Sequence, residues 1–436
     1  MGVRGRLLLV VLCLLGGPRP VMATEWFVSA GANGSGTGPE PFGRIQQALE
    51  MARPGDIVSV RPGVYIETLH TVRDGLPGAP VIVRGAPGAV IVTAPDTVLT
   101  IAHAFHVFDG FIFDAQYAAS DAVKVRTAAH YLILRQLEVR RSTRDCIDMG
   151  SPHDVLIERS LIHHCLNAAS GRTDAHAVVA GAIQNLTIRD TELHTFSGDG
   201  VQLDPARAAP GWSNVTIERC VFWLRPLEEP ENGFGVGVVP GENAVDTKTS
   251  RVGPRALITI RDTVASGFRS PLVRHMAAFN LKEHVHAVVD RVTVRDSEIA
   301  FRLRGPALVD IQNAVIDRVD FGVRYEDNIE RIQLWNSTFG RVGRAFLPAD
   351  AVKDAFKVRN LLFLSEKVPD EGSGPGSLAV GPKAFRNADE GDYRLAAGSP
   401  AIDAGRPVNV VVDRDGVPRP QGSAYDAGAY ELAGLR

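Results

Sequence analysis

The sequence is poor in cysteine, in aromatic residues and in net charge, and each shortage excludes a class of protein. Four cysteines among 436 residues are too few for a disulfide-based scaffold. Aromatic residues make up 7% of the chain, so a core must come mainly from valine, isoleucine, leucine and alanine. A formal net charge of −3 disfavours binding to nucleic acid over a wide surface. We therefore expect no nucleic-acid partner.

Long hydrophobic runs are also missing after the amino terminus. Arg4 and Arg6 precede the apolar run Leu7–Leu15, and the small residue Ala23 stands before Thr24. This order is typical of a secretory signal peptide over residues 1–23, and the run is too short to span a bilayer. No later segment approaches the roughly 18 apolar residues of a membrane span. We expect a secreted or periplasmic monomer with no integral membrane segment.

What the sequence does contain is a repeat. Short blocks of alternating β-branched residues, each followed by a polar pair, recur at intervals of mostly 22–31 residues. They read LILRQLEV (from Leu132), VLIERSLI (Val155), LTIRDTEL (Leu186), VTIERCVF (Val215), ITIRDTVA (Ile258), AVVDRVTV (Ala287), VDIQNAVI (Val309), IQLWNSTF (Ile332) and FKVRNLLF (Phe356), with a weaker copy, HVFDGFIF, at His106. Such a strand cannot bury its apolar edge alone, whereas stacked copies form a continuous core.

The repeat predicts an all-β fold, a right-handed parallel β-helix, because no block is followed by the amphipathic helix that a βαβ crossover needs. Apolar residues at helical spacing in 42–51 predict a short amino-terminal capping helix. We expect the β-helix with its cap to cover residues 24–365. Residues 366–436 would form a closing segment packed on the last coils.

Both ends of the chain resemble exported β-helix proteins. The stretch TEWFVSAGANGSGTGPEPFGRIQQALEMARPGDIVSVRPGVYIE, from Thr24, is similar to the cap and first coil of secreted bacterial β-helix polysaccharide enzymes. SPAIDAG (399–405) and DRDGVPRP…DAGAYE (413–431) resemble the closing segment of many exported β-helix proteins. These resemblances imply architecture and export.

Aligning the second strands of successive coils predicts two outward ladders of side chains, stacked about 4.8 Å apart. One ladder is Lys124, Asp148, Gln202, Asp246, Arg274, Arg302 and Arg324; the other is Arg126, Gly150, Asp204, Lys248, Met276, Arg304 and Glu326. The basic end would suit an anionic polysaccharide. Asp204, Glu242 and Asp246 could hold Ca²⁺ through oxygen ligands. Ordinary solvated charges remain the alternative interpretation.

The segment GENAVDTKTS (241–250) and the next coil resemble family-6 polysaccharide lyases, the alginate lyase and chondroitinase B group. The resemblance implies that Lys248 abstracts the C5 proton of a uronate and that Arg274, beside His275, neutralises its carboxylate. Asn243 and Gly241 stand where that family has calcium-binding glutamates. Family-9 lyases, with a lysine base and an aspartate calcium site, are similar to the same degree. Substrate contacts are then expected from Gln202, Asn243, His275, Arg302 and Arg324.

Other readings of the same sequence stay open. Asp199, Asp204 or Asp148 could serve a β-helix glycoside hydrolase or epimerase, and a non-catalytic carbohydrate-binding protein would need none of them. Cys146 and Cys165 could form a disulfide or remain buried thiols. The adjacent residues His163 and His164 should alternate across a strand, so we expect no metal there.

Overall fold

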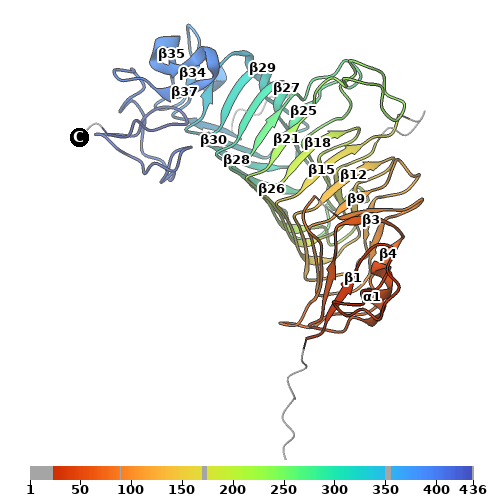
Figure 1. Ribbon diagram of the computed structural model, residues 1–436. Helices are drawn as coiled ribbons and strands as arrows, with labels where there is room; N and C mark the ends of the chain where they lie inside the picture. The colour runs from red at the N-terminus through yellow and green to blue at the C-terminus, as the bar shows by residue number, and fades with distance from the viewer. Residues whose placement is uncertain (1–22, 89, 169–173, 349–354, 435–436) are drawn as a thin grey trace, which may run out of the picture.

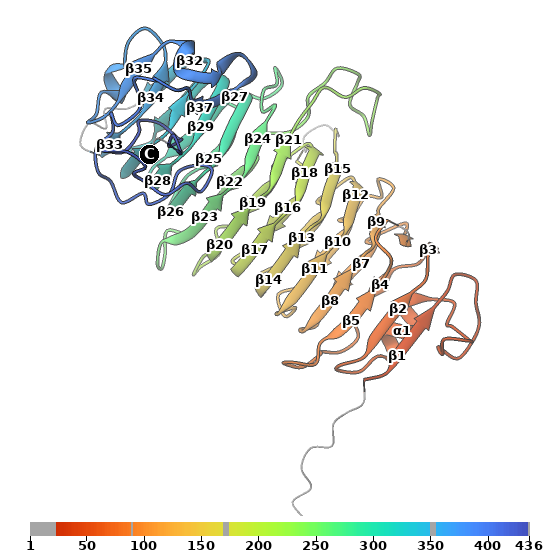
Figure 2. The ribbon, with the colours of Figure 1, turned by 60° about the vertical axis from the view of Figure 1, so that its left-hand side comes forward.

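The computed structural model describes residues 23–88, 90–168, 174–348 and 355–434, and the predicted signal peptide lies almost wholly outside them. The chain winds into an elongated solenoid whose coils stack from the amino-terminal to the carboxy-terminal end (Figures 1 and 2). All but one of the strand ladders are parallel, the exception being a small hairpin near the carboxy terminus. The prediction of a right-handed parallel β-helix is confirmed.

One side of the solenoid is a 13-stranded parallel sheet in which every block of the repeat supplies a strand. Its strands are β1 (Glu25–Val28), β2 (Ile57–Val60), β5 (Val81–Arg84), β8 (His106–Asp109), β11 (Leu132–Arg135), β14 (His153–Glu158), β17 (Gln184–Arg189), β20 (Ser213–Glu218), β23 (Ala256–Arg261), β26 (Val285–Asp290), β28 (Leu308–Gln312), β30 (Arg331–Trp335) and β33 (Phe356–Arg359). The predicted register holds, since Leu132 pairs with Val155, which pairs with Leu186.

The remaining long strands form two further stacks within a 22-stranded sheet. The first stack contains β3 (Gly63–Ile66), β6 (Val90–Thr93), β9 (Ile112–Asp114), β12 (Glu138–Ser142), β15 (Leu161–Cys165), β18 (Glu192–Phe196), β21 (Val221–Trp223), β24 (Val264–Ser266), the first halves of β27 (Thr293–Arg304) and β29 (Val315–Glu326), β31 (Thr338–Phe339), β34 (Leu362–Leu364) and β35 (Leu378–Val380). The second contains β4 (Leu69–His70), β7 (Leu99–Ile101), β10 (Val123–Val125), β13 (Ile147–Met149), β16 (Val178–Ala180), β19 (Val201–Leu203), β22 (Val245–Thr247), β25 (Ala277–Leu281), the second halves of β27 and β29, and β32 (Val342–Pro348).

The core is the continuous apolar interior that these stacks enclose. Alternate residues of the repeat point into this interior; Val155 and Ile157, for example, are 2% and 0% exposed. Burying a valine or isoleucine side chain contributes roughly 1.5–3 kcal/mol, so repetition over the coils stabilises the solenoid although no single coil could fold alone.

Each end of the core is covered. At the amino terminus the short helix α1 (Ile45–Met51) buries Ile45, Ala48 and Leu49, as predicted, and its first backbone N–H groups donate to the Glu67 carboxylate. At the carboxy terminus a second apolar cluster centred on Phe385 and Tyr393 packs against the last coils. The carboxy-terminal segment contains three 3₁₀ turns, η1 (Asp370–Gly372), η2 (Pro382–Ala384) and η3 (Ala388–Glu390), and the hairpin of β36 (Phe385–Asn387) and β37 (Asp392–Leu395).

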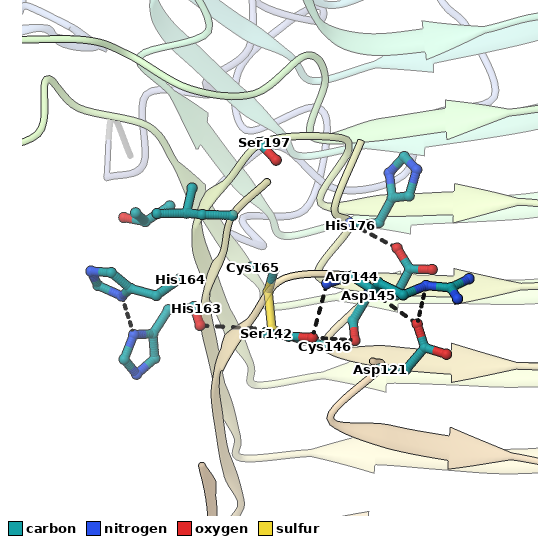
Figure 3. Close-up of a disulfide and its surroundings, with 12 residues drawn as sticks. Asp121, Ser142, Arg144, Asp145, Cys146, His163, His164, Cys165, His176 and Ser197 are labelled. Atoms are coloured by element: carbon teal, nitrogen blue, oxygen red, sulfur yellow. Dashed lines mark hydrogen bonds and ion pairs between the residues drawn. A yellow bond between two sulfur atoms is a disulfide. The ribbon is translucent and has the colours of Figure 1, made fainter. Parts of the chain in front are cut away.

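A disulfide joins Cys146, at the start of β13, to Cys165, at the end of β15, across 19 residues of sequence (Figure 3). Of the two possibilities left open by the sequence, the structure therefore has the disulfide. Cys220 is the remaining cysteine of the described chain, and burial raises the pKa of its thiol to about 12. It is an inert core residue.

The predicted ladders of the second stack need two corrections. The sequence alignment missed β16, which inserts Val179 between Asp148 and Gln202. It also took 272–276 as a strand, whereas the strand is β25, five residues later, so that Asn280 takes the place assigned to Arg274. The cause is that β25 is buried at all five positions and shows no alternation of polar and apolar residues.

No helix among the described residues is long and apolar enough to cross a membrane.

Candidate active site

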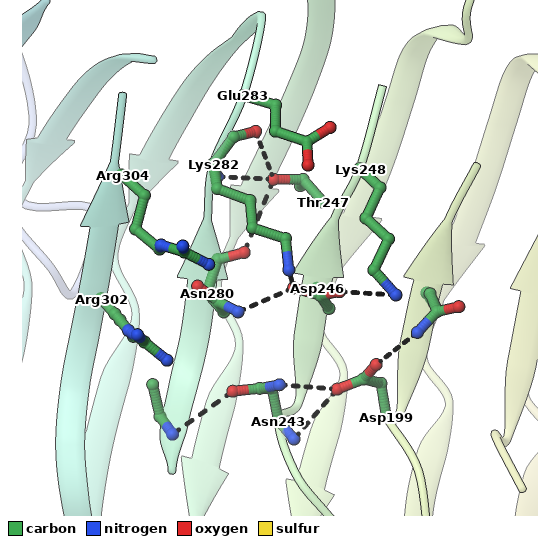
Figure 4. Close-up of polar contacts among 12 residues, drawn as sticks. Asp199, Asn243, Asp246, Thr247, Lys248, Asn280, Lys282, Glu283, Arg302 and Arg304 are labelled. Atoms are coloured by element: carbon green, nitrogen blue, oxygen red, sulfur yellow. Dashed lines mark hydrogen bonds and ion pairs between the residues drawn. The ribbon is translucent and has the colours of Figure 1, made fainter. Parts of the chain in front are cut away.

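A polar cluster on the second stack surrounds the carboxylate of Asp246, on β22 (Figure 4). Lys282 Nζ lies 2.7 Å from Asp246 Oδ1 and Lys248 Nζ lies 3.4 Å from Oδ2. The side-chain amide of Asn280 donates to Oδ1 at 2.8 Å. The Asp246 side chain is 3% exposed, while the side chains of Lys282 and Lys248 are 11% and 22% exposed. Two lysines therefore converge on one buried carboxylate and keep part of their surface toward solvent.

A second buried carboxylate, Asp199, lies beside this group. Its oxygens accept from the side-chain amides of Asn243 at 2.7 Å and Gln202 at 2.8 Å. Its backbone N–H donates to His176 Nδ1. Gly198 makes room for that imidazole, because a Cβ at this position would lie 2.5 Å from His176 Nδ1. Asp199 is fully buried, so it orients the two amides that were predicted to contact substrate and does not reach the surface itself.

The acidic side chains of this region are crowded together. Burial raises the pKa of Asp199, and burial together with the charge of Asp199 raises that of Asp246. Burial, with Asp199, Asp174 and Asp246 nearby, raises the pKa of Glu242 to about 7. The cluster concentrates negative charge that lysines or a bound cation can relieve.

A cationic row follows on β27 and β29, one and two coils beyond β25. Arg302 Nη2 and Arg324 Nη2 lie 2.6 and 2.8 Å from the two oxygens of Glu326, and Arg304 Nε lies 3.2 Å from the first of these. Burial raises the pKa of Glu326, but hydrogen bonds from Arg324 and Arg302 more than offset this and hold it below its usual value. Arg324 also contacts His275 Nδ1 at 2.8 Å. Three guanidinium groups around one carboxylate leave a net positive surface.

A hollow of about 400 Å³ opens between the lysine cluster and the cationic row. Charged side chains line most of it, namely Arg251, Lys282, Glu283, Arg304 and Asp327. Glu283 is held by Arg207 at 2.7 Å and accepts from the backbone N–H of Thr249. A wall of this composition suits a charged, hydrated ligand better than an apolar one.

The structure separates some of the residues that the sequence grouped. Arg274 is exposed and lies in the turn before β25, outside the ladder, so the prediction that it stacks between Asp246 and Arg302 is wrong. Met276, assigned to the second ladder, is buried in the core, and Lys282 follows β25 in its place. Asp204 is fully buried, and its strongest charged neighbours are Arg207 and Glu283.

Sequence reasoning missed Lys282 and Asn280. A signal was available, because Asn280-Leu281-Lys282 repeats the spacing of Asp246-Thr247-Lys248 and of Arg302-Leu303-Arg304 one coil away on either side. The alignment failed because it was anchored on apolar alternation and not on this polar–apolar–polar triplet.

The carboxylates proposed for a glycoside hydrolase or epimerase do not lie together at an exposed site. Asp148 is paired with Lys124 at 2.8 Å, and Asp199 and Asp204 are both inaccessible to solvent. A hydrolase needs two carboxyl groups that reach opposite sides of a sugar bond. The structure gives this reading no exposed pair among the residues proposed for it.

No protein-family model matches the chain, and no curated protein matches its sequence. Solved structures do resemble it. A pectate lyase, Pel9A, superimposes with a TM-score of 0.54 at 15% identity over 94% of this chain and 96% of its own. XylC in complex with xylose gives 0.53 at 10% identity over 93% and 98%, and a rhamnogalacturonan lyase gives 0.51 at 12% identity over 68% and 82%. At this level of identity the similarity establishes the fold alone, a parallel β-helix.

Proposed function

We propose that this protein is a polysaccharide lyase that cleaves a uronate-containing polymer by β-elimination. The observation that carries the proposal is the pair of lysines, Lys248 and Lys282, on the buried carboxylate of Asp246. Lys282 also lines a hollow together with Arg251 and Arg304. Elimination needs a base near the C5 proton and positive charge near the uronate carboxylate, and this arrangement supplies both.

We assign the base to Lys282. Lys248, the residue that the sequence favoured, lies 3.4 Å from Asp246 but does not line the hollow. Lys282 lies in the hollow itself, next to Arg304. In the reaction, Lys282 first gives its ammonium proton to solvent, and the resulting amine takes the C5 proton. The electron pair of that bond forms the C4–C5 double bond, the C4–O bond breaks, and the departing oxygen is protonated by solvent. Asp246 then stabilises the ammonium ion that results.

We assign neutralisation of the uronate carboxylate to the arginines of β27 and no longer to Arg274. Arg304 lines the hollow, and Arg302 lies in the same row as Asn280 and Asp246. Both share Glu326, so they are held in place before substrate binds. Positive charge fixed in advance stabilises the developing carbanion better than mobile solvent does.

Calcium remains part of the proposal. The oxygen donors present suit a hard cation, and Asn280 Oδ1 is buried without a hydrogen-bond partner in the described chain. Glu242 and Asp246 would hold the ion. Asp199 is fully buried and already accepts from two side-chain amides, and Asp204, the third ligand expected from the sequence, faces Arg207 instead. When bound, Ca²⁺ would add positive charge next to the uronate carboxylate. We also propose export by the signal peptide, which amino-terminal sequencing of protein from the periplasm and medium would test.

The deciding experiment incubates the purified protein with alginate, pectate, chondroitin and dermatan sulfate, and glucuronan, and follows the ultraviolet absorbance of the unsaturated uronate that elimination creates. On the polymer that responds, Lys282→Met should lower kcat by about 10²–10⁴-fold, the range for removal of a general base. Lys248→Met should cost less. Lys124→Met is the matched control, since Lys124 lies on the same stack of strands and also pairs with a carboxylate, and it should leave activity unchanged.

Each outcome separates the alternatives. New reducing ends without ultraviolet absorbance would show a hydrolase and overturn the lyase proposal. Binding without cleavage on every polymer would point to a carbohydrate-binding protein. Full activity in Lys282→Met with loss in Lys248→Met would return the base to Lys248. If EDTA has no effect, the calcium part alone is wrong.

A further inference from the structure

We propose that His163, His164 and His194 form a binding site for a divalent transition-metal ion, with Zn²⁺ as the ion of best fit. One ring nitrogen of each histidine lies within 4.8 Å of the other two, the only such grouping of three metal-ligating side chains in the described part of the chain. Imidazole nitrogens prefer Zn²⁺ and its neighbours to Ca²⁺, so the site differs in chemistry from the carboxylates around Asp246.

The backbone brings the first two rings to one side. Adjacent residues in a strand normally point to opposite faces, which is why the sequence argued against a metal here. His164, however, has a positive φ of 55°, and Arg141 (55°) and Thr195 (50°) have the same left-handed conformation at the equivalent corners of the neighbouring coils. This left-handed residue breaks the alternation and places the His164 ring beside that of His163 (Figure 3).

In both rings Nε2 faces a carboxylate, which leaves Nδ1 as the nitrogen that can bind a metal. His163 Nε2 lies 3.3 Å from Glu138 and His164 Nε2 lies 3.2 Å from Glu231, so each Nε2–H can donate to a carboxylate. The Nδ1 atoms of the two rings then face each other in direct contact. A carboxylate on the far nitrogen of a histidine is the usual way in which proteins orient a metal ligand and raise its basicity.

The third ring comes from the next coil. His194 pairs with His163 in the ladder and stacks on it with ring centroids 4.8 Å apart. On its other side Trp223 stacks at 4.0 Å and holds it in place.

A metal here would also fasten a loop. Glu231 belongs to the excursion between β21 and β22, and Tyr117 donates to its other carboxylate oxygen at 2.6 Å. Asn232, its neighbour, donates to the backbone carbonyl of Leu166. The ion would join β15, β18 and this loop through His163, His164, His194 and the carboxylate of Glu231 behind them.

The test is a titration of untagged, EDTA-treated full-length protein with Zn²⁺ in competition with a chromophoric chelator. We expect one zinc ion per chain with a dissociation constant at or below the micromolar range. His164→Ala and His194→Ala should each weaken binding by more than about 100-fold, and Glu231→Gln by about 10–100-fold, the range for a carboxylate behind a ligand. His153→Ala is the matched control, since His153 also stacks on a histidine and contacts a carboxylate, Asp154, at 2.7 Å.

A wild-type measurement keeps the test independent of how the variants fold. X-ray absorption of the protein with one equivalent of zinc should show at least three nitrogen ligands at about 2.0–2.1 Å. Zinc should also slow proteolysis within residues 224–239. Absence of stoichiometric binding, equal affinity in the histidine variants and in His153→Ala, or a ligand shell made of oxygen would each overturn the proposal.

Discussion

The closing segment contains a buried ion pair. Its loss should cost far more stability than the loss of a similar pair on the surface. Arg419 Nη1 lies 2.6 Å from Glu431 Oε2, and both side chains are 0% exposed. Arg419 also donates to the Gly428 carbonyl at 3.0 Å and to Asn313 at 3.3 Å. The pair thus ties the end of the chain to Asn313 on the coil that follows β28. Glu431→Gln keeps the shape of the side chain and leaves Arg419 charged and without its partner.

Removing one partner of a buried pair costs about 3–5 kcal/mol. We expect the lower end, about 3 kcal/mol, because Asp413 and Asp426 also act on Arg419. Arg394 and Asp415 provide the control: they lie 2.6 Å apart with side chains 43% and 36% exposed. Asp415→Asn should cost less than about 1 kcal/mol, as exposed pairs do.

Hydrogen–deuterium exchange over residues 366–434 measures the difference directly, because the segment can open without unfolding the solenoid. A loss of about 3 kcal/mol corresponds to exchange roughly a hundredfold faster. Arg419→Met combined with Glu431→Leu should recover most of the loss, since no unpaired charge remains. Equal exchange rates in Glu431→Gln and Asp415→Asn would refute the reasoning.

Three further predictions follow. Replacing Cys146 and Cys165 by serine should lower the free energy of unfolding by about 3 kcal/mol, as expected for a loop of this 19-residue separation. Denaturant unfolding of the variant and the wild type measures the difference, and an unchanged denaturant midpoint would contradict the prediction. Burial raises the pKa of Asp317, but hydrogen bonds from Arg341 and Tyr393 outweigh it and lower the pKa. The ionised Asp317 therefore stabilises the fold above the unfolded-state pKa of about 3.9, and this contribution is lost as pH falls through the folded-state pKa. The difference in free energy of unfolding between wild type and Asp317→Asn should shrink below about pH 4. A difference that is constant with pH would exclude the ion-pair origin. Arg324→Ala should raise KM on the responsive polymer with little change in kcat, since Arg324 lies two coils beyond Asn280; a fall in kcat alone would place it in the transition state.

The fold was predictable because its signal is local and repeated. Each block carries its own period-two alternation, and a parallel solenoid is the arrangement in which many such edges bury one another. The helix at 45–51 and the closing segment follow from the same need to cover an open core. The predicted outward ladder was right wherever the second strand alternated, as at Lys124, Asp148, Gln202, Asp246, Arg302 and Arg324.

The sequence predicted only some of the residues of the candidate site. Asp246 lies on β22 and Lys248 directly follows this strand, so the sequence alone places the two residues close together. Lys282 reaches Asp246 from the next coil, and its position depends on where β25 begins, which a continuously apolar strand does not reveal. Export and the roles of the site residues remain predictions.

The sequence by itself determined the repeat, the architecture and the polar character of the second strands, because these depend on the order of residues within each coil. The tertiary structure decided which residues from different coils meet. It set the register of β25, closed the disulfide between Cys146 and Cys165, and, through one left-handed residue at His164, turned a second imidazole toward the first. Alternation along a strand is fixed by the chain's own geometry, whereas register and corner conformation are fixed by what the neighbouring coils require.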